Sequence, residues 1–197
     1  GLYAGLFTPT EAGAVGVFFA LVVTIATGRL TFEGFINSVT ESLKISAMVF
    51  FLVTGAIIFG RFLAVTRLPF AIAEFASSLP VSPYVILAFI LLIYLIGGCF
   101  VDSLGFLVLT IPIFFPLGMA LGFDPIWYAI ILTMVTTMGA ITPPVGVNIY
   151  VVKALAPDIE LSTMFKSVSF FLIACIVCII ILIIFPDIVL FIPEMAR

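Results

Sequence analysis

The sequence predicts an all-α protein that crosses a membrane several times. Hydrophobic residues make up 64% of the chain and charged residues only 9%, which is far more apolar than a water-exposed surface allows. A hydrocarbon layer about 30 Å thick requires roughly 20 apolar residues for each helical crossing. A single transmembrane domain, 1–197, with about five or six crossings is therefore expected. Because the chain starts at Gly1 and continues into apolar sequence, we expect a fragment of a longer protein.

Two spans are predicted in the first third of the chain. The first covers about residues 12–28 and follows a helix-start signal, in which Thr8 is placed to cap the helix and Glu11 can complete a capping box. The second span covers about residues 43–64. The segment 29–42 between them is predicted to be a mixed polar connection, with room for a short interfacial helix.

A break interrupts the next apolar stretch. A polar connection, 67–83, leads into residues 84–121, where paired glycines and Asp102 fall within the segment 97–103. Non-helical backbone at membrane depth is tolerated only where it is buried in protein or lines a wet cavity. A re-entrant hairpin over 84–121, with its tip at 97–103, is therefore predicted. Two full crossings joined by a surface turn fit the hydrophobic periodicity equally well.

A second break is predicted inside a hydrophobic element at 126–155. Pro143 and Pro144 cannot both continue an α-helix, because each lacks an N–H donor and clashes with the preceding turn. The helix is expected to unwind there and to restart at once, with Thr142 as its N-cap and Pro143 at the first helical position. The last span is predicted at about 168–185.

The composition excludes two classes of function. The chain has no histidine and carries no nucleophile motif or phosphate-binding loop, so an enzyme is not expected. Its seven Lys and Arg residues are scattered singly, without the basic stripe that nucleic acid requires. Membrane lipid is therefore an expected partner and nucleic acid is not.

The two breaks are candidates for a binding site. In discontinuous helices, the N-terminal ends of half-helices point at anionic groups, while unwound carbonyls and C-terminal ends coordinate Na⁺ or protons. Residues 139–142 offer carbonyls and the hydroxyl of Thr142 to a hard cation, which prefers oxygen ligands. The restart at Pro143 offers N–H groups to a carboxylate.

Two polar residues near the breaks have alternative roles. An acid in an apolar stretch is costly, so Asp102 is predicted to be a cation ligand or a proton site, and a helix cap or interfacial turn is the alternative. Asn148 lies about one and a half turns beyond Thr142 at the usual helical repeat. It either faces the same cavity or is hydrogen-bonded between helices.

Three motifs resemble those of one transporter family. They are Phe7-Thr8-Pro9-Thr10-Glu11-Ala12, then Gly98-Cys99-Phe100-Val101-Asp102-Ser103 with a later Gly122-Phe123-Asp124-Pro125, and Gly139-Ala140-Ile141-Thr142-Pro143-Pro144-Val145-Gly146-Val147-Asn148. In this order they are similar to the large membrane subunit of the tripartite ATP-independent periplasmic (TRAP) transporters, over essentially the whole chain. The resemblance implies the elevator fold of the ion-transporter superfamily, built from two inverted repeats. This chain would be mainly the second repeat, the C-terminal half, in the inner membrane of a bacterium or archaeon.

The resemblance also implies a function, partners and a site. The family imports C4-dicarboxylates, sialic acids and related carboxylates by Na⁺ symport, with a small membrane subunit and a periplasmic solute-binding protein. No cofactor is implied beyond Na⁺ as the coupling ion. The Na⁺ site would be formed by Gly97, Gly98, Asp102, Ser103, Gly139, Ala140 and Thr142. The carboxylate substrate would be held by Thr142, Pro143, Pro144 and Asn148.

Two other interpretations fit the same sequence. A single-component dicarboxylate or citrate carrier, coupled to Na⁺ or H⁺, would share the broken helices and would need no binding protein. A non-transporting subunit that anchors or assembles other proteins would show no cation dependence. The assembly role leaves the break at Thr142-Pro143-Pro144 without a purpose.

Overall fold

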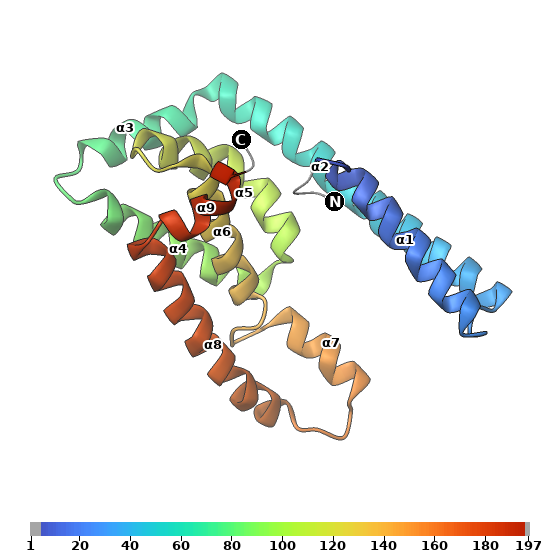
Figure 1. The fold of residues 1–197 in the computed structure, drawn as a ribbon. Coiled ribbons are helices and arrows are strands. Elements are labelled where there is room, and N and C mark those ends of the chain that lie inside the picture. The colour runs from blue at the N-terminus through green and yellow to red at the C-terminus, as the bar shows by residue number, and fades with distance from the viewer. Residues whose placement is uncertain (1–4, 196–197) are drawn as a thin grey trace. The chain divides into compact units, whose positions relative to one another are not determined.

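All regular secondary structure is helical in the computed structural model, which describes residues 5–195 apart from the side chains of residues 77, 154 and 194. Nine helices lie within this range (Figure 1): α1 Pro9–Ala26, α2 Phe32–Thr66, α3 Leu68–Ser78, α4 Pro83–Phe100, α5 Ser103–Ala120, α6 Pro125–Gly139, α7 Val147–Leu155, α8 Leu161–Ile184 and α9 Asp187–Met195. Five of them, α1, α2, α4, α5 and α8, are long and apolar enough to cross a membrane. This confirms the predicted all-α class and fits a polytopic membrane protein.

The chain divides into two compact units, residues 1–50 and residues 51–195. The first unit contains α1 and the beginning of α2. A capping box starts α1, because the Thr8 hydroxyl accepts the N–H of Glu11 at 3.3 Å and the Glu11 carboxylate accepts the N–H of Thr8 at 2.8 Å. Apolar side chains of α1 such as Phe18 are largely exposed, as a lipid-facing helix requires.

The helix α2 begins at Phe32, before the span predicted at 43–64. The helix for which the polar connection 29–42 left room is therefore continuous with this span and not a separate short helix. The hydroxyl groups of this segment support the helix, because Ser38 donates to the carbonyl of Gly34 and Thr40 donates to that of Ile36. No proline interrupts the 35 residues of α2, which extend about 52 Å.

The core of the second unit is built around α6, whose buried side chains contact α4, α5, α8 and α9. Tyr94 of α4 is fully buried, and its ring packs edge-on against Phe106 and Phe114 of α5 with ring centroids 5.5 Å apart in both cases. Its hydroxyl oxygen accepts a hydrogen bond from Thr110 at 2.9 Å. Aromatic packing and this buried hydrogen bond therefore hold α4 and α5 together.

The turn between α4 and α5 is narrower than the tip predicted at 97–103. Between the end of α4 and the start of α5, only Val101 and Asp102 lie outside a helix. Gly97 stays helical, and a side chain at this position would collide with the ring of Phe106. The paired glycines therefore lie in helical backbone and allow close packing, and the prediction of unwound backbone at Gly97 and Gly98 is wrong.

Three more segments differ from the predicted boundaries. The connection predicted at 67–83 contains α3, which has Pro69 in its first turn, where a missing N–H is tolerated. The helix α8 begins at Leu161, seven residues before the span predicted at 168–185, because its first turns are polar and do not continue the apolar pattern. The hydroxyl of Ser167 donates to the carbonyl of Thr163 within these turns. The chain after this span forms α9.

The replacement Trp127→Phe is expected to loosen α6 from α8. The indole N–H of Trp127 donates to the carbonyl of Leu182 at 2.7 Å, and phenylalanine keeps the ring but loses this donor. A buried hydrogen bond of this kind contributes about 0.5–1.5 kcal/mol. Thermal unfolding of the purified protein in detergent should show a lower midpoint, whereas Tyr84→Phe, at a more than half-exposed ring, should not. Equal midpoints for Trp127→Phe and wild type would contradict this role of the indole.

Candidate functional site

The two breaks predicted from the sequence lie against each other in the second unit. Gly98, in the last turn of α4, packs directly on Gly139, the last residue of α6. A Cβ atom on Gly139 would lie 2.6 Å from the carbonyl oxygen of Leu95 and 2.9 Å from the Cα of Gly98, and one on Gly98 would collide with the carbonyl of Thr136. Only glycine fits at these two positions, so the C-terminal ends of α4 and α6 meet backbone to backbone.

Two side chains extend this contact to the turn and to the unwound segment. The hydroxyl of Ser103, the first residue of α5, donates to the carbonyl of Thr136 at 3.5 Å. The thiol of Cys99 points at the carbonyl of Pro143 at 3.8 Å, as a weak donor. The end of α4, the start of α5, the end of α6 and the segment after it therefore surround one region.

Asp102 caps α5 in this structure. Its Oδ2 atom accepts the N–H groups of Leu104 and Gly105, both at 3.2 Å. The side chain is exposed, and its second carboxylate oxygen is available to another ligand. The capping alternative for Asp102 is thus realised, and it places a negative charge at the same turn.

The unwound segment follows another path than the one predicted. The hydroxyl of Thr142 donates back to the carbonyl of Met138 at 2.7 Å, so Thr142 extends the end of α6 and does not cap the next helix. The prediction of a restart at Pro143 is wrong, because α7 begins at Val147. The residue before α7 is Gly146, which has φ 59°, a left-handed conformation that glycine adopts without steric cost.

Asn148 is tied to the end of α6 through its backbone. Its N–H donates to the carbonyl of Ala140 at 3.1 Å, across the unwound segment. Its side chain is exposed. The structure therefore brings the first turn of α7 to the same region as the ends of α4 and α6.

The helix ends decide what this region can bind. The last carbonyls of a helix lack intrahelical partners and carry partial negative charge, so the ends of α4 and α6 together favour a cation. The N-terminal end of α5 is already neutralised by Asp102. The N-terminal end of α7 has no such carboxylate within its first turn and favours an anion.

Sequence reasoning missed Thr136. Its side chain is fully buried, and its carbonyl accepts both the Ser103 hydroxyl and, at 3.3 Å, the N–H of Ala140. Nothing in the residue type signals this role, because the backbone atom carries it. Only the spacing of three residues before Gly139 could have indicated that Thr136 lies at the end of α6.

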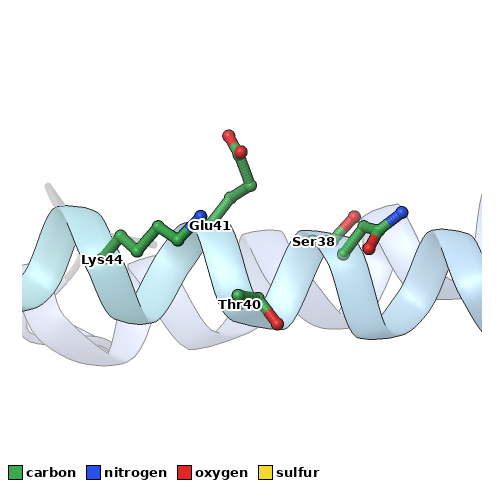
Figure 2. A pocket seen from close by; sticks show the side chains of 5 residues that line it. Ser38, Thr40, Glu41 and Lys44 are labelled. Atoms are coloured by element: carbon green, nitrogen blue, oxygen red, sulfur yellow. The ribbon is translucent and has the colours of Figure 1, made fainter.

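A polar hollow of about 400 Å³ lies elsewhere, in the first unit (Figure 2). It is lined by one stretch of α2, namely Asn37, Ser38, Thr40, Glu41 and Lys44. The hydroxyls of Ser38 and Thr40 donate to their own helix, and the charges of Glu41 and Lys44 are opposite. This set does not converge on one ligand charge, so the region around the two breaks is the candidate site.

The replacements Gly98→Ala and Gly139→Ala should each force α4 and α6 apart. Overpacking a close contact costs about 1–3 kcal/mol, so the unfolding midpoint in detergent should fall for both. Gly55→Ala is the matched control, because a Cβ at this helical position would meet nothing within 4 Å. Unchanged midpoints for both site variants would show that the helices do not depend on this contact.

Comparison with known proteins identifies the family. Residues 1–188 match the model of the family described as "Tripartite ATP-independent periplasmic transporter, DctM component". The sialic acid TRAP transporter large permease protein SiaM of Vibrio cholerae serotype O1 is 33% identical over 196 residues, which cover 99% of this chain and 46% of that protein. The C4-dicarboxylate TRAP transporter large permease protein DctM of Pseudomonas aeruginosa is 35% identical over 156 residues, 79% of this chain and 36% of that protein.

A third relative is the isethionate TRAP transporter permease protein DctMQ of Oleidesulfovibrio alaskensis, 36% identical over 157 residues, 79% of this chain and 25% of that protein. The chain spans less than half the length of each of these relatives. The predicted resemblance is confirmed by both comparisons. This multi-pass, all-helical membrane chain belongs to the DctM component family of the tripartite ATP-independent periplasmic transporters.

Proposed function

We propose that this chain is the C-terminal half of a large membrane subunit that imports small organic anions by Na⁺ symport, in the inner membrane of a bacterium or archaeon. It would form the second inverted repeat of an elevator fold, with α4 and α5 as the re-entrant hairpin. The observation that carries the proposal is the meeting of the C-terminal ends of α4 and α6 at Gly98 and Gly139. Membership of a transporter family supports it.

The proposed Na⁺ position lies at these two helix ends. Carbonyl groups of the last turns, those of Gly97, Gly98, Gly139 and Ala140, are oxygen ligands of the kind that a hard cation prefers. Three of them already accept an N–H, that of Gly97 from Val101, that of Gly139 from Thr142 and that of Ala140 from Asn148, so each would offer its second lone pair. Asp102 and Ser103 lie at the adjoining turn, where the carboxylate adds negative charge. The hydroxyl oxygen of Thr142 adds a further acceptor beside the Met138 carbonyl.

The proposed substrate position lies at the first turn of α7. The positive end of this half-helix attracts a carboxylate. The amide of Asn148 is exposed there, and the segment with Thr142, Pro143 and Pro144 forms the adjoining wall. Two early N–H groups are already engaged, that of Asn148 with Ala140 and that of Ile149 with Gly146, so side chains and the dipole supply more of the attraction than free N–H groups do.

The substrate class and partners follow from the family. The relatives are named for sialic acid, C4-dicarboxylates and isethionate, which are all small organic anions. We propose an anion of this size, delivered by a periplasmic solute-binding protein, and a small membrane subunit as a permanent partner. A single-component carrier would need neither.

Uptake into proteoliposomes tests this function. The complete large subunit, its small subunit and the binding protein are reconstituted, and radiolabelled sialic acid and C4-dicarboxylates are supplied with and without an inward Na⁺ gradient. We expect uptake that requires both the gradient and the binding protein. Uptake without the binding protein would indicate a single-component carrier, and no anion uptake by a verified folded preparation would favour an assembly role.

The replacement Asp102→Asn should raise the Na⁺ concentration for half-maximal uptake by about tenfold, the effect of losing roughly 1.4 kcal/mol of interaction with a cation. Asparagine caps helices as well as aspartate does, so α5 keeps its cap and loses only the charge. The matched control is Asp124→Asn, because Asp124 caps α6 in the same way, accepting the N–H groups of Ile126 and Trp127. Equal effects of the two replacements on Na⁺ dependence would show that Asp102 acts only as a helix cap.

A further inference from the structure

We propose that Lys153 is a positioning residue. By fixing the direction of α7, it fixes the position of the N-terminal end of α7, which faces the substrate in the proposed site. The inference rests on the proposed function, since it concerns the site assigned there to the anion. It is carried by two short hydrogen bonds and by the weak packing of α7.

The helix α7 has little apolar packing of its own. It has nine residues, and isolated helices of this length are marginal in water, since most helical stability comes from packing of an apolar face. Ile149 is buried, whereas Tyr150, Val151, Val152 and Leu155 are all about half exposed or more. Within this chain, the direction of α7 therefore depends on the burial of Ile149 and on the contacts at its two ends.

The N-terminal end is tied to the site. The N–H of Asn148 donates to the carbonyl of Ala140. Gly146, just before the helix, lies against the ring of Phe165 in α8, where an added Cβ would be 3.1 Å from the ring. These contacts fix one point on the helix axis and leave its tilt open.

Lys153 ties the C-terminal end. Its Nζ atom donates to the carbonyl of Pro157 and to that of Ile159, both at 2.6 Å. These carbonyls belong to the loop that turns the chain from α7 into α8, the helix that packs against α7 (Figure 1). Hydrogen bonds from an ammonium group are stronger than neutral ones, and a cation in the last turn also suits the helix dipole.

The hydrogen bonds of Lys153 to the loop after α7 fix the tilt of this helix. Nine residues extend about 13 Å, so Lys153 acts on α7 from the end opposite the proposed anion. Displacement of a binding group by about 1 Å is enough to weaken a positioned site strongly. The proposed Na⁺ position depends less on Lys153, because it lies at the glycine contact between α4 and α6, and because its link to α7, the hydrogen bond from Asn148 to Ala140, is at the other end of that helix. Loss of Lys153 should therefore change substrate affinity and leave Na⁺ affinity unchanged.

The test uses the complete transporter with Lys153→Met, Lys153→Arg and Lys166→Met. Methionine keeps the length and apolar stem of lysine and removes its donors, arginine keeps charge and donors, and Lys166 is an exposed lysine of α8 that serves as control. We expect Lys153→Met to raise the KM for sialic acid or C4-dicarboxylate about tenfold. The Na⁺ concentration for half-maximal uptake, measured at substrate concentrations scaled to each KM, should stay constant. Lys153→Arg and Lys166→Met should resemble wild type.

Hydrogen exchange gives a second readout that does not need transport. Amides of 147–155 should exchange faster in Lys153→Met than in Lys166→Met, while amides of α4 and α6 keep their rates. Equal exchange over 147–155 would overturn the inference, as would a parallel change in the KM and in the Na⁺ dependence. Faster exchange in a transporter that shows no Na⁺-driven uptake would support the role of Lys153 in α7 and overturn the proposed function instead.

Discussion

The close contact between Gly98 and Gly139 is the constraint on which the second unit depends. Because neither residue carries a side chain, α4 and α6 approach until the peptide groups of one helix touch those of the other. This approach brings the turn of α4 and α5 to the unwound segment, and it allows Ser103 to reach the Thr136 carbonyl. Tyr94, packed on Phe106 and Phe114, then fixes α5 in the same block.

The sequence predicted the helical class and the presence of a break within 84–121 and within 126–155, because both depend on local properties. Apolar runs reveal a lipid environment, and Pro143 and Pro144 end a helix in any surroundings. The details around the breaks depend on contacts between distant segments. Whether Gly97 unwinds or packs is decided by the ring of Phe106, and the hydroxyl of Thr142 can either cap the next helix or bond backward.

The candidate site was predictable in the same partial way. The family resemblance implied that Gly98, Ser103 and Gly139 gather, and these residues do lie together, with the first turn of α7 beside them. It did not indicate the contributions of Thr136 and Lys153, because each acts through a carbonyl whose direction is set by the path of the backbone.

The glycine contact has an evolutionary consequence. The carbonyl ligands of the proposed cation position do not depend on side-chain identity, so substitutions at positions other than Asp102, Ser103 and Thr142 leave its ligands in place as long as the two backbones can still touch. The residues at the proposed anion position are not subject to this constraint. Relatives that share about a third of their residues with this chain carry the names of different anions. A coupling ion held by backbone carbonyls would let such proteins change the transported anion while they keep the same energy source.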